Sequence, residues 1–170
     1  MIQLAFEPAF DPFHSAFRVL RQAVFHNDAI DIERLKILDV YLVEPRHCLN
    51  IRLPGPLKKS ARKAASCQRD NYGRLPSASV LFDRMAPIQD AAIQTLVSRG
   101  LLDADAFCQN KILRSDILLG ENLIKRIDES NKKQINLMNF LYVDLNNIPI
   151  MGPNGLKSRT GLSEYRYDIV

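Results

Sequence analysis

The chain has 170 residues and a mass of 19.3 kDa, with 46% hydrophobic and 25% charged residues. These values are close to the average of globular proteins, so they exclude a disordered chain, a collagen-like fibre and a disulfide-stapled miniprotein. The formal net charge is +4 and the isoelectric point is near 9.0. This positive charge is small compared with that of proteins that wrap nucleic acid.

The sequence favours a cytoplasmic protein. Its first residues lack the basic segment and small-residue cleavage site of a signal peptide. No apolar run approaches the roughly 18–20 residues that a membrane span needs, so no membrane contact is expected. The cysteines Cys48, Cys67 and Cys108 are odd in number and unevenly spaced, which is typical of reduced thiols.

The first predicted helix begins at Asp11 and Pro12, which fit an N-cap and a first-turn proline. Apolar residues then recur at helical spacing: Phe13, Ala16, Phe17, Leu20, Ala23 and Val24. The opposite side of this helix, which we expect to face solvent, carries Arg18, Arg21 and Gln22.

Further helices are predicted from local signals in the middle of the chain. Asp31 can cap a second helix, which Pro45 ends. Ser77 can cap a third helix, and Pro87 suits the first turn of a fourth helix that Gly100 ends.

A short strand is predicted at residues 111–114, after the helix that ends at Gly100. A helix ending in Gly-Leu-Leu and followed by a small hairpin resembles the recognition helix and wing of winged-helix domains. We therefore predict a mainly α fold with a small β component: a winged-helix-like domain, a long C-terminal helix and an ordered tail at residues 148–170. An irregular all-α bundle is the alternative, and in either case residues 1–170 form a single domain.

The pattern of residues 121–147 predicts one long helix with a heptad-like apolar seam. Asn131 and Gln134 form a polar layer in the middle of that seam. A core helix is one interpretation. The other is a helix that docks on the coiled coil of a partner, with the polar layer fixing the register.

The net charge is concentrated in residues 57–74, where six Lys and Arg residues accompany one acid. This basic segment carries +5, which leaves −1 on the rest of the chain. Its apolar face is thin, so we expect an exposed helix or loop. The cations could bind phosphates of double-stranded DNA or an acidic partner surface, or only be solvated: Lys58, Lys59, Arg62, Lys63, Arg69 and Arg74.

No motif in the sequence points to catalysis. His14, His26 and His47 are dispersed, and neither Cys-x-x-Cys nor His-x-x-x-His occurs. The segment GPNGLKS at 152–158 lacks the contiguous Gly-Lys-Ser of a Walker A loop. We therefore predict no enzyme activity, no cofactor and no metal site.

Several segments together resemble the middle component of bacterial ABC-three-component systems, the Lamassu-like defence operons: FDPFHSAFRVLR at 10–21, RLKILDVYLVEP at 34–45, IRLP at 51–54, RMAPIQDAAIQTLVSRGLL at 84–102 and GPNGLKSRTGLSEYRYD at 152–168. The resemblance implies a small non-catalytic adaptor between an SMC- or Rad50-like coiled-coil ABC ATPase and an effector, often a nuclease, in anti-phage or anti-plasmid immunity. It implies a hetero-oligomer and supplies no catalytic residues. A stand-alone winged-helix DNA-binding regulator is the alternative function.

The resemblance suggests that the C-terminal tail contributes to a protein interface. Tyr and Arg are enriched at protein interfaces because they combine large contact area with directed hydrogen bonds. The candidate interface residues are Asn131, Gln134, Lys157, Arg159, Tyr165 and Arg166. The alternative is that the tyrosines pack the tail onto the body of the protein itself.

Overall fold

The structure, a computed structural model, describes residues 7–67 and 76–162. It is mainly helical with one small antiparallel sheet, which confirms the prediction of a mainly α fold with a small β component. The helical elements are η1 (Pro8–Phe10), α1 (Pro12–His26), α2 (Ile32–Val43), η2 (Pro45–Asn50), α3 (Gly55–Ala65), α4 (Ala78–Ser98), α5 (Ala104–Cys108), α6 (Glu121–Lys133), α7 (Ile135–Asn139), the π-helical turn η3 (Phe140–Asp144) and α8 (Leu156–Thr160). The strands are β1 (Ile30–Asp31) and β2 (Lys111–Ile112).

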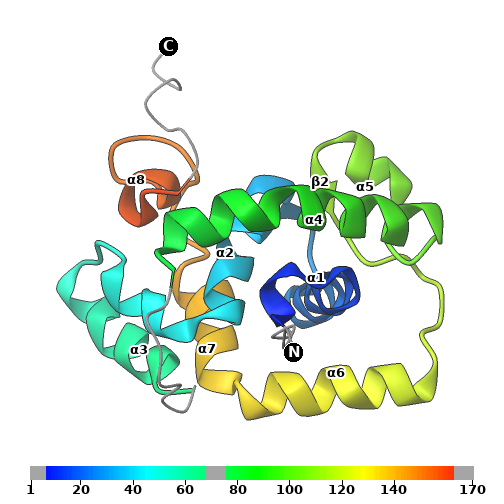
Figure 1. Ribbon diagram of the computed structural model, residues 1–170, viewed down its shortest axis with the longest axis horizontal. Coiled ribbons are helices and arrows are strands. Elements are labelled where there is room, and N and C mark those ends of the chain that lie inside the picture. Colours follow the sequence, from blue (N-terminus) through cyan, green and yellow to red (C-terminus); the bar gives the residue numbers. More distant parts are fainter. Residues whose placement is uncertain (1–6, 68–75, 163–170) are drawn as a thin grey trace, which may run out of the picture.

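Helix α1 is the central element of the fold. It contacts α2, α4 and α6, and in Figure 1 it lies between α4 and α6. The predicted N-cap is confirmed, since the Asp11 side chain accepts a hydrogen bond from the backbone N–H of His14 at 2.8 Å. At its other end, Asn27 adopts a left-handed conformation and its backbone N–H donates to the Ala23 carbonyl.

The predicted orientation of α1 is confirmed for Leu20 and Ala23, which are buried, but it is wrong for the polar side of the helix and for its first turn. Arg18, Arg21 and Gln22, expected to face solvent, are buried, while Phe13 at the start of the helix is 84% exposed. The physical reason is that α1 is covered on several sides, so its polar stripe also packs inside the protein. The first turn extends past that cover and leaves an aromatic ring in solvent.

Helix α4 is one continuous helix, so the prediction of two helices divided at Pro87 is wrong. An interior proline removes one backbone hydrogen bond, and here the packing of α4 along α1 and α2 holds the helix continuous. The predicted ends are confirmed: Ser77 caps the first turn, and Gly100 has a φ of +71°. The backbone N–H of Leu101 then donates to the Leu96 carbonyl at 2.9 Å, as expected for a Schellman ending.

The strand predicted at residues 111–114 is present as β2, but its main partner is β1, which the sequence pattern did not predict. The two pair antiparallel, with Ile30 opposite Ile112. The hairpin expected after α4 is reduced to a single bridge between Leu102 and Arg114, and α5 lies in the connection. The small sheet thereby links the end of α4 to the start of α2.

The single helix predicted over residues 121–147 is interrupted at Gln134, so that prediction is wrong. Gln134 has φ −113° and ψ 30°, outside the helical region, and it separates α6 from α7. Figure 1 shows α7 turning away from the direction of α6. The apolar seam is nonetheless buried inside this protein at Ile127, Met138 and Leu141, as the core-helix interpretation requires.

Candidate functional site

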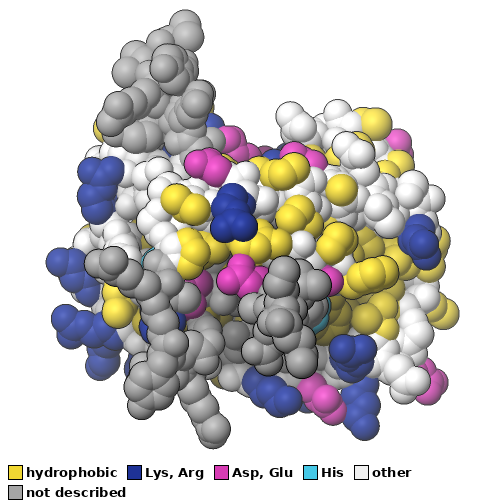
Figure 2. All heavy atoms as spheres, in the orientation of Figure 1, with side chains coloured by type: hydrophobic (Ala, Val, Ile, Leu, Met, Phe, Trp, Pro, Cys, Tyr) yellow, Lys and Arg dark blue, Asp and Glu magenta, His cyan; other side chains and the backbone are white. Residues whose placement is uncertain are grey.

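Helix α3 carries four of the predicted cations on its outer side. Lys58, Lys59, Arg62 and Lys63 are all exposed. None of the four forms an ion pair with any residue that the structure describes. Figure 2 shows Lys and Arg side chains gathered at the edge of the molecule where Figure 1 places α3. These four residues are named the basic face from here on.

The opposite side of α3 anchors the helix. Ala61, Ala64 and Ala65 are buried, and α3 contacts η2 and α7. Alanine adds no rotamer entropy cost and lets helix backbones approach closely, so the thin apolar face suffices to hold the helix. The basic segment is therefore an exposed helix as far as Ala65, and its cations project from a helix that is packed against η2 and α7.

Four of the predicted contact residues lie outside the described part of the chain: Arg69, Arg74, Tyr165 and Arg166. They stay predictions.

The polar layer predicted for a partner is used within the protein. Arg21 Nε donates to Asn131 Oδ1 at 3.0 Å, and Arg21 Nη2 donates to Gln134 Oε1 at 2.8 Å and to the Ser130 carbonyl at 3.2 Å. In return, Asn131 Nδ2 donates to the Arg21 carbonyl at 3.3 Å. These bonds join α6 to α1 at the point where the helix is interrupted. Asn131 is buried, whereas Gln134 is half-buried.

Two predicted interface cations of the tail are bound to the body of the protein. Lys157 is buried, and its Nζ lies 2.6 Å from Glu33 Oε1 on α2. Arg159 Nη1 donates to the Arg52 carbonyl at 2.7 Å, and Arg159 Nε donates to the Asn154 carbonyl at 2.6 Å. The cations therefore fasten α8 to α2 and to the segment before α3.

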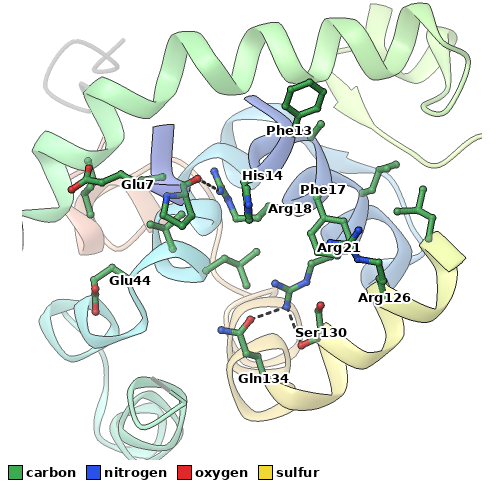
Figure 3. Close-up of a pocket in the computed structure, with 18 of the residues that line it drawn as sticks. Glu7, Phe13, His14, Phe17, Arg18, Arg21, Glu44, Arg126, Ser130 and Gln134 are labelled. Carbon is green, nitrogen blue, oxygen red and sulfur yellow. Dashed lines mark hydrogen bonds between the residues drawn. The ribbon is translucent and has the colours of Figure 1, made fainter. Parts of the chain in front are cut away.

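A cavity of about 900 Å³ opens beside α1, between α1 and α6, and is also lined by residues of η1, the end of α2 and α4. Its lining includes Phe13, Phe17 and Arg21 from α1, with Arg126 from α6 and Gln134 directly after it. Figure 3 shows these side chains projecting from the two facing helices. No local sequence signal predicts this cavity, because its lining residues come from several segments between Glu7 and Gln134.

The two buried guanidinium groups of α1 have different surroundings. Arg18 Nε lies 2.8 Å from Asp39 Oδ1, so its charge is met by a carboxylate. Arg21 donates only to neutral oxygens in the described structure. Burial is the main cause that lowers the pKa of Arg21, while Asp39 raises it and Arg18 lowers it. An incompletely neutralised cation therefore lies beside the cavity.

Asp39 is the centre of a buried polar network that sequence reasoning missed. It is 0% exposed and accepts from Arg18 Nε and Nη2, from Gln22 Nε2 at 3.2 Å and from Gln89 Nε2 at 2.9 Å. The Tyr142 hydroxyl in turn donates to Gln22 Oε1. The one available signal was an acid inside the apolar run ILDVYLV at 37–43, since a buried carboxylate requires partners. The network ties α1, α2, α4 and η3 together.

The adjacent Cys48 and His47 are not arranged as a thiol and its base. Burial raises the pKa of the Cys48 thiol, while the neighbouring His47 binds the Pro76 carbonyl through Nε2 at 3.0 Å. Across residues 7–67 and 76–162, no group of three or more His, Cys, Asp or Glu side chains could hold a metal ion. Within the same ranges, no helix is both long and apolar enough to cross a bilayer.

Comparison with known proteins gives one match. The family model described as ABC-three component (ABC-3C) system Middle Component 5 matches residues 4–168. No curated protein and no solved structure matches the chain. The family match includes both α3 and the two helices that wall the cavity. Because it covers almost the whole sequence, the chain belongs to the Middle Component 5 family of ABC-three component systems.

Proposed function

We propose that this middle component is a non-catalytic adaptor in a Lamassu-like anti-phage or anti-plasmid defence system of the cytoplasm. In this role it joins a coiled-coil ABC ATPase of the SMC or Rad50 kind to an effector nuclease. Family membership supports the accessory role. The basic face of α3 is the main structural observation behind the proposal. It supports contact between the assembled complex and double-stranded DNA.

The chemistry of the basic face suits a duplex backbone. Its four cations are exposed and have no carboxylate partner among the described residues. Cations that neutralise phosphates release condensed counterions, which drives association at low salt. The helix carries no aromatic side chain between Gly55 and Ala65. Since binding of a single strand depends largely on base stacking on aromatic rings, a duplex is the better ligand.

A stand-alone winged-helix regulator is a weaker proposal on physical grounds. In that reading α4 would be the recognition helix, because the bridge between Leu102 and Arg114 follows it. Helix α4 contains one cation, Arg84, and two acids, Asp83 and Asp90. A helix with this charge balance gains little from a negatively charged groove.

Reversing three charges of the basic face tests the DNA contact. The triple variant Lys59→Glu, Arg62→Glu, Lys63→Glu is expected to weaken duplex binding by the complex about a hundredfold or more. It should reduce the slope of log affinity against log salt by about three, or roughly one per lost phosphate contact. Fluorescence anisotropy with a duplex at several salt concentrations measures both quantities.

The matched control reverses three exposed cations of α6: Lys125→Glu, Lys132→Glu, Lys133→Glu. Both triple variants change the net charge equally, so equal losses would contradict a local role of α3. If the α3 variant instead breaks assembly while DNA affinity is retained, the basic face binds an acidic partner surface. Duplex binding by the isolated chain as strong as that of the complex would favour the stand-alone regulator.

A further inference from the structure

We propose that the cavity between α1 and α6 is the docking site for a segment of another component of the same system. The segment carries an Asp or Glu beside an aromatic or branched aliphatic side chain. This inference rests on the proposed adaptor function and adds a second surface, distinct from the basic face, with a different chemistry.

Part of the cavity wall is apolar. Phe13 is 84% exposed at the start of α1 and lines the cavity together with the half-buried Phe17 and Leu123. Figure 2 shows apolar side chains gathered on the face between α4 and α6. An exposed aromatic ring in an apolar patch is typical of a surface that another molecule covers. The volume of about 900 Å³ is large enough for several side chains.

The same cavity also carries positively charged side chains. Arg21 donates through Nε and Nη2 to neutral oxygens, and its Nη1 forms no hydrogen bond to any described atom. Arg126 lies 5.6 Å from the centre of the Phe17 ring and has no carboxylate partner in the described structure. Two carboxylates, Glu7 and Glu44, also line the cavity, but Figure 3 shows them on the far side from Arg21 and Arg126, and Glu44 pairs with Arg46. A carboxylate that entered beside Arg21 and the exposed Arg126 would supply an anion to that end of the cavity. Hydrogen bonds of this charge-assisted kind are stronger than neutral ones.

Together, the apolar wall and the cationic side chains determine which kind of segment can bind in the cavity. An aliphatic segment alone would leave the guanidinium groups without an anion, and a bare phosphate would leave the apolar wall exposed. Residues 1–6 of this chain, MIQLAF, contain no acid and so cannot supply a carboxylate side chain. A partner segment that combines an acid with an apolar side chain can contact both the apolar wall and the guanidinium groups.

The test uses the purified chain with the purified ATPase and effector components of its own system. Phe13 is replaced by a photo-crosslinking benzoylphenylalanine, and the crosslinked peptides are identified by mass spectrometry. We expect crosslinks to one component, at a segment where an Asp or Glu lies within a few residues of an aromatic or aliphatic side chain.

Affinity measurements complete the test. Arg126→Glu is expected to weaken binding of that component about tenfold or more, as for a charge at an interface hot spot. The matched control Lys125→Glu alters the adjacent residue, which is exposed on α6 and does not line the cavity. It should change the affinity less than about twofold, the scale of a peripheral charge.

The possible outcomes separate the inference from the adaptor function. If the complex forms but Arg126→Glu and Lys125→Glu have equal effects, the inference is overturned and the adaptor function stands. Crosslinks confined to the same chain, whether to residues 1–6 or to residues 163–170 with their own acids and tyrosines, to a second copy or to DNA also overturn the inference. If the unaltered chain binds neither component, both proposals are overturned.

Discussion

Replacing Asp39 with Asn is expected to lower the free energy of unfolding by about 3–5 kcal/mol, the usual cost of breaking a buried ion pair. The carboxylate is 0% exposed and receives two hydrogen bonds from Arg18. Without its charge, the Arg18 guanidinium is left as an uncompensated cation in the interior. Urea denaturation followed by circular dichroism measures the loss.

The control for this variant is Asp90→Asn on α4. Asp90 is exposed and forms a 2.8 Å ion pair with Lys36. A surface pair of this kind contributes less than about 1 kcal/mol. Similar losses for the two variants would show that the network around Asp39 does not hold α1 in the centre of the fold.

The variant Gly155→Ala is expected to be the second most damaging, with a loss of about 1–3 kcal/mol or more. A Cβ atom at this position would lie 2.2 Å from the backbone carbonyl oxygen of Met151 and 2.7 Å from that of Ile150. These neighbours are backbone atoms, so the loop before α8 would have to move. That movement would disturb the fully buried Leu156 and the Lys157–Glu33 ion pair.

Gly120→Ala is the matched control, because Gly120 and Gly155 are both N-caps of a helix without a side-chain capping bond. A Cβ at Gly120 meets no atom within 4 Å. Its substitution should therefore cost no more than about 1 kcal/mol, the typical scale of N-cap preference. Thermal unfolding of the two variants compares them directly, and equal midpoints would contradict the predicted clash.

The break at Gln134 links the two candidate surfaces. Helix α6, before the break, lines the cavity, while α7, after it, packs against α3. The hydrogen bonds from Arg21 to Asn131 and Gln134 hold this junction against α1. The polar layer therefore sets the position of both surfaces from inside the protein.

Signals that act over a few residues were predictable from the sequence. The Asp11 cap, the Ser77 cap and the Gly100 ending depend on neighbouring backbone atoms, so the residue types alone reveal them. The clustering of Lys58, Lys59, Arg62 and Lys63 is likewise a local property of α3.

Features that depend on distant partners were not predictable. Arg18 and Arg21 look like solvent-facing residues until Asp39, on α2, and Asn131, on α6, are placed beside them. The pairing of β1 with β2 and the break at Gln134 have the same origin, because each needs a contact between segments far apart in the chain. The cavity depends on the packing of α1 against α6 in the same way.

Co-expression of the three components of the system, followed by size-exclusion chromatography with light scattering, tests the adaptor function most directly. If the chain is the adaptor, it elutes in one complex with the ABC ATPase and the effector, and the complex is lost when the chain is omitted. Elution of the chain alone, at a mass near 19.3 kDa and apart from an assembled ATPase and effector, would contradict the adaptor function.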